Sequence, residues 1–403
     1  MKIAGIVAEY NPFHNGHAHH IERTRSLSAG CEATHVVAVM SGNFVQRGEP
    51  ALLPKAERVR AALAGGVDLV VELPLPWALS SAEGFAFGAV SLLDALGCVD
   101  TLSFGSECGD LSALAKVTEA LEAPRFSDLL HYHLDMGIAF PEARQRAVAE
   151  VAGKRTAELL SSPNNLLGIE YLKALRRLES SIIPFTIERF GAEHDARAPL
   201  GDVASASYIR TLVREGRLLN AAPYLPASVF AILSKASEAG RCPTEEALIE
   251  RAVLARLRTL PKEALGNLPG LSEGLENRLY AAIRQAGTLN ELAAQVKTRR
   301  YPMTRVKRLL WSAFLGIPAG YESRTPPYIR VLGVGTRGAE VLSAARGAGL
   351  PLLSRSSQLD RLEGEARAVW ELESRAADLY ALALPQPYAC GAEYTTGLVR
   401  GME

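Results

Sequence analysis

The stretch that decides the fold is IAGIVAEYNPFHNGH, residues 3–17, close to the start of the chain. Its first part, Ile3 to Ala8, is apolar or small and predicts a buried strand. A helical pattern follows from about His17 to Leu27. The junction of a strand with a helix is where an open parallel sheet binds phosphates, because backbone N–H groups and the positive end of the helix point there. This loop is therefore the first candidate for a functional site.

The residues of the loop suit phosphate chemistry. Gly16 has no Cβ, so a base or a phosphate could approach the backbone closely. The imidazoles of His14 and His17 could donate hydrogen bonds to the charge that builds on a phosphoryl group in transfer. A metal site is a weaker interpretation of the crowded histidines, because no cysteine or acid pattern accompanies them. In addition, His19 and His20 should lie on different helix faces. The position directly after the first strand favours a functional loop over an ordinary surface loop.

The composition bounds the class of protein. At 403 residues the chain can hold two or three domains. Lysine plus arginine and aspartate plus glutamate both number 44, so any nucleic-acid surface must be a local patch. The five cysteines lack CxxC spacing, which favours free thiols over disulfides or a zinc site. No signal-peptide pattern opens the sequence, and no apolar run is long enough to cross a bilayer. We expect a cytoplasmic protein without membrane association.

Strands and helices alternate through the first half of the chain. Such alternation implies right-handed βαβ crossovers, so we expect an α/β fold with a Rossmann-like parallel sheet over residues 1–217. The helical segment at about 111–160, rich in Ala, Arg and Glu, is interpreted as an insertion in that domain. The further predicted strands are residues 34–40, 68–73, 101–104 and 184–189, and the predicted helices include 54–63, 81–96 and 166–178.

Several other predicted loops end at the same edge of the sheet. Lys55 and Arg58 lie one turn apart at the start of a helix. They could reach a triphosphate, or they could form a solvated helix face. Gly105 follows a strand end, where a ribose or base could lie, or a plain turn could occur. The pair Asn164 and Asn165 opens a helix, where asparagine is usually only an N-cap.

A more specific pattern is Ser205-Ala206-Ser207-Tyr208-Ile209-Arg210. Hydroxyls at a helix start, with an arginine one turn further on, suit a phosphate clamp. Together with the His-x-Gly-His loop, this pattern resembles the ATP site of the HIGH nucleotidyltransferase superfamily, which closes with Ser-Ser-Thr-x-Ile-Arg. Ala206 departs from that motif and removes its second hydroxyl, which weakens the implied role of the two serines.

Longer runs narrow the resemblance. Residues 5–17, 39–48 (VMSGNFVQRG), 104–107 (FGSE) and 163–171 (PNNLLGIEY) together closely resemble the bacterial tRNA(Met) cytidine acetate ligase family, across nearly the whole chain. The resemblance implies that acetate and ATP give acetyl-adenylate and pyrophosphate. The acetyl group then passes to N4 of the wobble cytidine of elongator tRNA(Met). It also implies Mg²⁺ held mainly by phosphates and water, and it indicates no obligate protein partner.

The resemblance assigns roles to individual residues. His17 would face the α-phosphate and His14 the leaving pyrophosphate, as the catalytic pair. Of the two asparagines, we favour Asn164 as the ATP contact over Asn165. The implied ATP contacts are Val7, Ala8, Glu9, Tyr10, Asn11, Pro12, Phe13, His14, Asn15, Gly16, His17, Ala18, His19, His20, Gly105, Asn164, Asn165 and Arg189. The possible phosphate contacts are Lys55, Arg58, Ser205, Ser207 and Arg210.

The second half of the chain has a different pattern. Residues 218–325 are almost wholly helical in pattern and are expected to form a helical domain. Residues 297–308 within it carry cations interleaved with an aromatic residue and no acid. Such a stretch suits tRNA, with cations for phosphates and an aromatic ring for a base, although a solvated basic helix end has the same pattern. The resemblance favours tRNA. The candidate tRNA-binding residues are Lys297, Arg299, Arg300, Tyr301, Arg305, Lys307 and Arg308.

The tail, residues 326–403, is expected to form a small α/β lobe. A predicted strand at 328–332 precedes GVGTRG at 333–338, which matches GxGxxG. A lone match is weak, and Arg355 follows a serine where the acid of a dinucleotide site would stand. We therefore interpret the glycines as a tight turn. RNA contact through Arg337 or Arg355 is left open.

Two other functions fit the same ATP loops. An enzyme that adenylylates a small phosphate-bearing cofactor would use them, but it would not need the long helical half or the basic stretch. A non-catalytic RNA-binding protein that holds ATP only as a ligand is the second alternative, and the intact His14 and His17 argue against it. Acyl specificity, the choice of tRNA and the oligomeric state stay open at this level.

Overall fold

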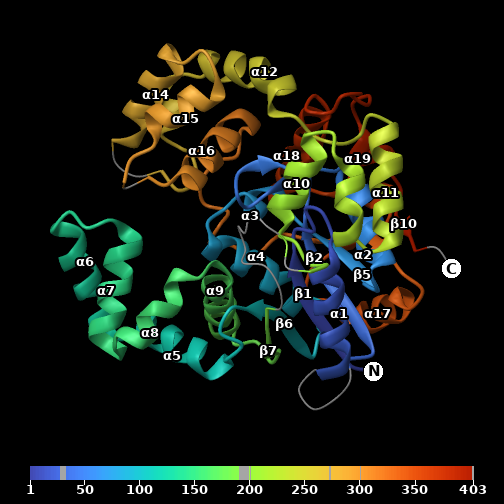
Figure 1. Ribbon diagram of the computed structural model, residues 1–403, viewed down its shortest axis with the longest axis horizontal. Helices are drawn as coiled ribbons and strands as arrows, with labels where there is room; N and C mark the ends of the chain where they lie inside the picture. Colours follow the sequence, from blue (N-terminus) through green and yellow to red (C-terminus); the bar gives the residue numbers. More distant parts are fainter. Residues whose placement is uncertain (28–32, 190–198, 200, 272–273, 300, 402–403) are drawn as a thin grey trace.

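A mixed β-sheet runs through the centre of the molecule in the computed structural model of the chain (Figure 1). The structure describes residues 1–27, 33–189, 199, 201–271, 274–299 and 301–401. Within these residues the sheet has eight strands in the order β10-β8-β5-β2-β1-β6-β7, with β9 beside β8. The strands are β1 (Ile3–Ala8), β2 (His35–Ser41), β5 (Leu69–Leu73), β6 (Thr101–Ser106), β7 (Ile183–Glu188), β8 (Ile329–Val334), β9 (Leu352–Leu353) and β10 (Val399–Arg400), and β3 (Phe44–Val45) pairs with β4 (Glu49–Pro50) in a separate hairpin.

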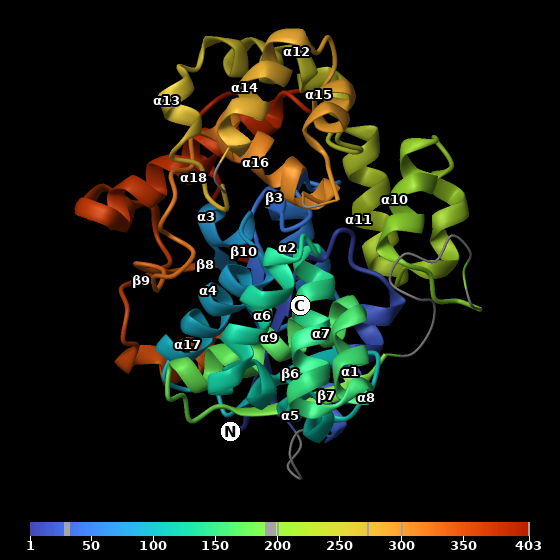
Figure 2. The same ribbon diagram turned by 90° about the vertical axis from the view of Figure 1, so that its left-hand side faces the viewer.

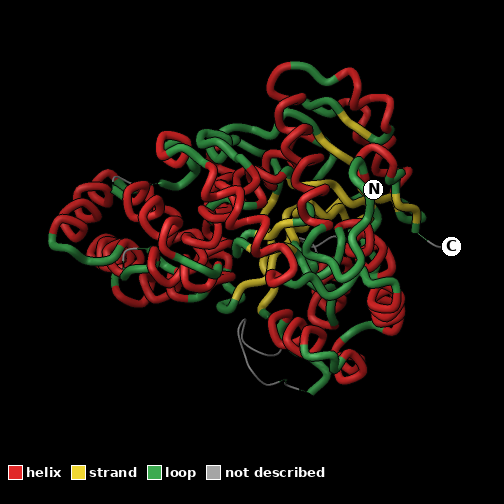
Figure 3. Tube along the Cα trace, turned by 90° about the horizontal axis from the view of Figure 1, so that it is seen from above, coloured by secondary structure: helices red, strands yellow, loops and turns green. Residues whose placement is uncertain are grey.

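Buried side chains alternate between the two faces of the sheet, as the period of two in a strand requires. In β2, Val36 and Met40 join an apolar core on one face, whereas Val37 and Val39 join the core on the other. β1, β2, β5, β6 and β7 are parallel, and helices lie on both sides of them (Figure 3). The predicted α/β fold with a parallel sheet is therefore confirmed. The helices α1 (Asn15–Leu27), α2 (Lys55–Ala64) and α11 (Ala227–Glu238) cover the first face, and α4 (Ala82–Ala95) and α9 (Pro163–Arg177) cover the second.

The predicted insertion is a run of helices between β6 and β7. Asp110 is the N-cap of its first helix. Its carboxylate accepts hydrogen bonds from the N–H groups of Ser112 and Ala113, which have no partner within the helix. Two of the helices, α6 and α7, form a pair that projects from the sheet (Figures 1 and 2). The run consists of α5 (Leu111–Glu122), α6 (Pro124–Asp135), α7 (Phe140–Ala152), α8 (Lys154–Glu158) and the short η2 (Leu159–Ser161).

The helices of the second half divide between two cores. α10 (Ala206–Arg214), η3 (Leu218–Tyr224) and α11 pack on the sheet together with α2. The later helices lie to one side of the sheet in Figure 1 and form a second apolar core, to which Phe44, Leu75 and Tyr380 from other parts of the chain also contribute. The separate helical cluster thus begins at α12, later than the expected boundary at residue 218. Its members are α12 (Glu246–Thr259), α13 (Lys262–Leu265), α14 (Leu275–Gln285), α15 (Leu289–Val296) and α16 (Met303–Leu315). None of the described helices is both long enough and apolar enough to span a membrane.

The tail returns to the central sheet. β8 pairs with β5 in the antiparallel direction, so the segment expected as a lobe of its own extends the main sheet instead. Glycines in β8 and just after it allow this docking: a Cβ at Gly333 would collide with Val59 of α2, and one at Gly338 would collide with the carbonyl of Asp68. This explains the GxGxxG pattern as close packing. The remaining helical elements are α3 (Leu75–Ala78), α17 (Gly338–Ala344), η4 (Ala345–Gly347), η5 (Ser356–Arg361), α18 (Gly364–Ala381) and α19 (Ala392–Thr395).

Candidate active site

A cavity of about 230 Å³ opens at the carboxyl edge of β1, β6 and β7. The structure brings most of the predicted site residues to its walls, although they come from widely separated parts of the chain. Those that line it are Val7, Ala8, Glu9, Tyr10, Asn11, His14, Gly16, His17, His19, His20, Gly105, Asn164, Arg189, Ser205, Ser207 and Arg210. Pro12, Phe13, Asn15, Ala18 and Asn165 do not line it.

The loop after β1 is held by its own buried side chains. Tyr10 adopts a left-handed backbone conformation with φ of 48°, and its ring packs against Phe13 at 4.9 Å between centroids. Helix α1 begins at Asn15, two residues before the expected start. The Nδ2 group of Asn15 donates to the carbonyls of Asp202 and Pro223, at 2.9 and 3.0 Å. Phe13 and Asn15 therefore anchor the loop, and the prediction that they contact ATP directly is not supported by their positions.

The two central histidines form a stacked pair. Their ring centroids lie 3.8 Å apart at an interplanar angle of 25°. The Nδ1 atom of His14 accepts from the N–H of Gly16 at 3.1 Å, and Nδ1 of His17 accepts from the N–H of His14 at 3.2 Å. A neutral imidazole that accepts at Nδ1 carries its proton on Nε2. Burial, together with His14, Arg189 and His20, holds the pKa of His17 well below 6.5. His17 is thus a neutral ring with an Nε2–H donor at the cavity.

The outer histidines are held differently. His20 interacts through Nε2 with the hydroxyl of Ser103 on β6 at 3.1 Å. Burial, reinforced by Arg189 and His19, lowers the pKa of His20 to about 4. His20 therefore ties α1 to the sheet as a neutral residue. Across the described part of the chain, no three His, Cys, Asp or Glu side chains are grouped as metal ligands.

Two glycines leave room for side chains of the site. A Cβ on Gly16 would lie 2.9 Å from Cε1 of His14, inside normal contact distance. A Cβ on Gly105 would lie 3.2 Å from Cγ of Arg189. The sequence predicts that Gly16 admits the nucleotide, and the structure adds that it admits the ring of His14.

Glu107 locks the end of β6 to the start of α9. Its Oε1 accepts from the N–H and the Nδ2 group of Asn164, at 3.1 and 2.7 Å, and its Oε2 accepts from the N–H of Asn165 at 2.7 Å. Asn165 in return accepts at Oδ1 from the N–H groups of Glu107 and Cys108. The backbone N–H and the Oδ1 atom of Asn165 are thus both engaged in holding β6 to α9. Asn164 faces the cavity, and its Oδ1 accepts from Arg189 at 3.3 Å.

Sequence reasoning missed the role of Glu107. The FGSE run carries part of the family resemblance, but no local pattern shows that its carboxylate caps a helix 57 residues further along the chain. A carboxylate at this helix start also faces the positive end of the helix dipole.

The start of α10 and the β3–β4 hairpin form the opposite wall. Ser205 caps α10 by accepting from the N–H of Tyr208 at 3.1 Å. Arg210 donates to the carbonyl of Asn11 at 2.9 Å and pairs with Glu49 at 3.4 Å. The carboxylate of Glu9 accepts from the N–H of Gln46 at 2.7 Å, and burial raises the pKa of Glu9. Gln46, Arg47 and Glu49 line the cavity as well, and sequence reasoning did not find them.

Lys55 and Arg58 require a correction, because neither lines this cavity. Arg58 is fully buried and donates to the carbonyls of Glu9 and Gly42, so it braces the histidine loop from below. Lys55 forms ion pairs with three carboxylates, Glu72, Glu373 and Glu393. The ammonium group of Lys55 is therefore already paired within the protein and is not available to bind a phosphate.

The basic stretch is only partly exposed. Lys297 and Arg299 are exposed, and Arg300 lies outside the described residues. Tyr301 is buried in the helical core, which corrects its expected role as a platform for a base. The remaining cations are engaged: Arg305 donates to the carbonyl of Gly270, Lys307 pairs with Glu246, and Arg308 donates to the carbonyl of Gln46. In the tail, Arg337 pairs with Asp68.

Known proteins are similar to this sequence over nearly all of its length. The family model described as HIGH Nucleotidyl Transferase matches residues 1–393. A protein of Acetivibrio thermocellus named tRNA(Met) cytidine acetate ligase is 38% identical, and the alignment covers 99% of this chain and 100% of the relative. A protein of the same name from Caldanaerobacter subterraneus subsp. tengcongensis is 39% identical over 95% of this chain and 96% of the relative.

Solved structures share the whole architecture. Apo Thermotoga maritima TmcAL matches with a TM-score of 0.93 at 33% identity, over 99% of this chain and 100% of that chain. The same protein bound with alpha-thio ATP matches with a TM-score of 0.91. Coverage this complete includes the insertion, the helical cluster and the tail as well as the sheet. The chain therefore belongs to the HIGH nucleotidyltransferase family and, within it, to the tRNA(Met) cytidine acetate ligases.

Proposed function

We propose that this protein is an ATP-dependent ligase that acetylates N4 of the wobble cytidine of elongator tRNA(Met), with acetate as the acyl donor. The observation that carries the proposal is the stacked pair of His14 and His17 at the carboxyl edge of the sheet. In a chain of this family, that pair is where a triphosphate would be cleaved. The proposal includes a cytoplasmic location, which matches the free thiols of the described cysteines.

The first step is adenylate formation. An acetate oxygen attacks the α-phosphorus of ATP, the bond to the bridging oxygen of the β-phosphate breaks, and pyrophosphate leaves with the bonding electrons. No proton transfer is needed, so the task of the protein is alignment and charge stabilisation. The Nε2–H group of His17 suits the α-phosphate side. Arg189 adds a positive charge that Asn164 orients.

The second step is acyl transfer. The N4 amine of cytidine attacks the acetyl carbon, the bond from that carbon to the phosphate oxygen breaks, and AMP leaves. The nitrogen loses one proton as the amide forms. Glu9 is a carboxylate at the cavity whose pKa is raised by burial, and a more basic carboxylate is a better proton acceptor.

Mg²⁺ fits this pocket as a companion of ATP. Two of the three carboxylates on the walls are engaged, Glu9 with the N–H of Gln46 and Glu49 with Arg210, and the third is Glu188 at the end of β7. Phosphate oxygens and water would therefore supply most of its ligands, with the second oxygen of Glu9 as the protein group at hand. When bound, the ion would neutralise charge on the leaving pyrophosphate.

For tRNA, we propose a division of the chain. Residues 1–217 activate acetate, residues 218–325 supply one surface for tRNA, and residues 326–403 join the two parts. Arg308 supports this division, since it joins α16 to the hairpin that borders the ATP cavity. The exposed cations Lys297 and Arg299 lie just before that helix.

The test uses ATP labelled on the α-phosphate, a panel of small acids, and tRNA(Met) transcripts. Acetate should give labelled acetyl-adenylate and then AMP together with acetylated tRNA. Adenylyl transfer to a phosphate-bearing cofactor would favour the first alternative. ATP that is bound but never cleaved with any acid, with or without tRNA, would favour the non-catalytic one.

A further inference from the structure

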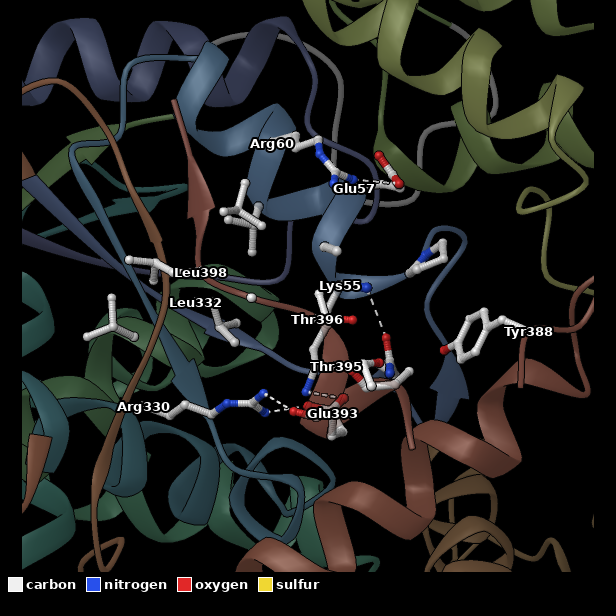
Figure 4. A pocket seen from close by; sticks show the side chains of 18 of the residues that line it. Lys55, Glu57, Arg60, Arg330, Leu332, Tyr388, Glu393, Thr395, Thr396 and Leu398 are labelled. Atoms are coloured by element: carbon white, nitrogen blue, oxygen red, sulfur yellow. Dashed lines mark hydrogen bonds and ion pairs between the residues drawn. The ribbon is translucent and has the colours of Figure 1, made fainter. Parts of the chain in front are cut away.

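A second cavity, of about 770 Å³, lies away from the histidine loop (Figure 4). Its walls are the start of α2, the connection from α11 to α12, and the tail from Tyr388 to Val399. Asn43 borders it, whereas Gln46 lines the ATP cavity, so the loop that carries the β3–β4 hairpin separates the two. The mechanism above uses none of this space.

The walls of this second cavity are positively charged. Five cationic and two anionic side chains line it, although the chain as a whole is neutral. The cations are Lys55, Arg60, Arg241, Arg330 and Arg355, and the acids are Glu57 and Glu393. An anionic ligand is the complementary partner of such a cavity.

The charged side chains at the floor of the cavity form ion pairs with one another. Figure 4 shows Glu393 between Lys55 and Arg330, and it forms ion pairs with both. All three side chains are at least nine-tenths buried. Arg330 pairs further with Glu72 and lies over the ring of Trp370 at 4.5 Å. Buried donors engaged in this way leave no place at the floor for a phosphate.

The rim has a different character. Arg60 lies on α2, Arg241 in the connection between α11 and α12, and Arg355 in the loop after β9, and all three are exposed or half-buried. Arg60 pairs with Glu57 at 2.7 Å, so Arg241 and Arg355 are the two rim cations best placed for a ligand. Arg241 lies over the ring of Tyr388 at 5.1 Å. Below them, side chains such as Leu332 and Leu398 make an apolar wall. An aromatic ring and an apolar wall suit a base, and spread cations suit the phosphates on either side of it.

From this arrangement we infer that the second cavity takes one nucleotide of a single-stranded RNA, with its base beside Tyr388 and its flanking phosphates on the rim arginines. The occupant is a strand and not a free mononucleotide, because the available cations lie around the mouth and not at the floor. The inference rests on the proposed function, since the RNA at hand is the anticodon loop of the tRNA substrate.

Cys390 provides a probe in the native protein, because it is exposed and lines the cavity. Its alkylation by iodoacetamide is followed by mass spectrometry, with half-buried Cys98 as internal reference. A tRNA(Met) anticodon stem-loop at about ten times its Kd should slow the alkylation of Cys390 about tenfold, since about nine-tenths of the protein is then occupied. Saturating ATP or cytidine 5′-monophosphate should leave the rate unchanged.

Substitutions test the same contact without relying on the thiol. Tyr388→Leu should weaken stem-loop binding about tenfold, as the removal of one base–aromatic stack does, and Tyr388→Phe should not. Arg241→Gln should weaken it, whereas Arg346→Gln, an exposed arginine outside both cavities, should not. ATP binding should be unchanged in all four variants.

Three results overturn the inference. If Cys390 is protected by a free nucleotide as well as by RNA, the cavity is a mononucleotide site. If the stem-loop binds and is acetylated while Cys390 stays reactive and Tyr388→Leu binds normally, RNA does not enter this cavity, and the proposed function still stands. A parent protein that binds no stem-loop refutes the proposed function itself, and this inference with it.

Discussion

At the scale of single residues, His17 has the clearest chemical role. Its neutral ring offers an Nε2–H group to charge that develops in transit. His17→Ala should therefore lower adenylate formation about 10²-fold or more, as the loss of a comparable donor does in other enzymes. ATP affinity should change much less. The measurement is acetate-dependent adenylate formation at saturating ATP, with His131→Ala, an exposed histidine on α6, as the matched control. Near-normal rates in His17→Ala would contradict the assignment.

The protonation state of His17 gives a second prediction. Because burial holds the pKa of His17 well below its ordinary value of 6.5, the ring should remain neutral as pH falls from 8 to 6.5. The rate of adenylate formation should show no titration of an imidazole over this range. A rate that follows a pKa near 6.5 and loses that dependence in His17→Ala would show that the histidine is not buried as described.

Gly16 is the other residue at this scale. An added side chain would push the ring of His14 out of its stack, since Cβ would lie 2.9 Å from Cε1 of His14. Gly16→Val should abolish measurable ATP binding in calorimetry. The thermal unfolding of the apo protein should change little, because glycine is a poor helix former and the neighbouring ring can move. Gly347→Ala, which meets no neighbour within 4 Å, is the control. ATP binding at parental strength in Gly16→Val would place the nucleotide elsewhere.

At the scale of elements, the lock between β6 and α9 governs the orientation of Asn164 and Arg189. Glu107→Gln replaces a double acceptor with a group that presents an N–H toward the start of α9. We expect a loss of stability of about 1–3 kcal/mol, the cost of an unsatisfied buried group. ATP affinity should fall about tenfold, since one good hydrogen bond to a charged group contributes on this order. Urea unfolding and ATP titration measure the two effects. Glu158→Gln, an exposed glutamate before α9, should change neither.

The accuracy of the predictions made from the sequence differs from element to element. The strand-to-helix loops were predictable, because alternation along the chain fixes which edge of a parallel sheet they share. The cations on α2 were not, since the charge of Lys55 is balanced by the carboxylate of Glu393, more than 300 residues further along the chain. Tyr301 likewise matches an RNA pattern but is buried in the helical core. Contacts between residues so far apart in the sequence arise from tertiary packing, and no local sequence pattern predicts them.

At the scale of the whole molecule, a buried charge cluster fastens the tail to the sheet. It joins Lys55 of α2 and Glu72 of β5 to Arg330, Glu373 and Glu393 of the last 80 residues. Burial, together with Glu72, raises the pKa of Glu373 to about 8, against an ordinary value near 4.5. Between these values the folded protein holds a proton that the unfolded chain releases. This group therefore makes stability fall as pH rises from about 4.5 to 8.

Glu373→Gln keeps the acceptor for the N–H of Leu75 and removes the titration. The free energy of unfolding of the variant should thus decline less between pH 5 and pH 8 than that of the parent. Urea unfolding at several pH values measures this difference. Glu371→Gln, an exposed glutamate on the same helix, should follow the parent. Parallel curves for Glu373→Gln and the parent would mean that Glu373 is ionised throughout this range.

The whole molecule also has to bring the bound tRNA, which we assign to the helical part, to the cavity where acetate is activated. The exposed cations Lys297 and Arg299 can be changed to Gln without touching the ATP cavity, whereas Arg308 bonds to the hairpin that borders that cavity. In the double variant, adenylate formation should survive while tRNA acetylation collapses. The slope of log affinity against log salt should become shallower by roughly 0.7 to 0.9 for each RNA phosphate that the variant no longer neutralises.

The matched control removes two charges from the same helical cluster, at Arg256 and Lys262, which are exposed and lie on α12 and α13. A uniform field effect would weaken tRNA binding equally in both double variants, whereas a local contact would weaken it only in the first. Arg308→Gln should differ from both, because it should impair adenylate formation as well as tRNA binding. If Lys297 and Arg299 prove silent, phosphate contacts must be sought at the rim around Arg355 or along the projecting α6 and α7.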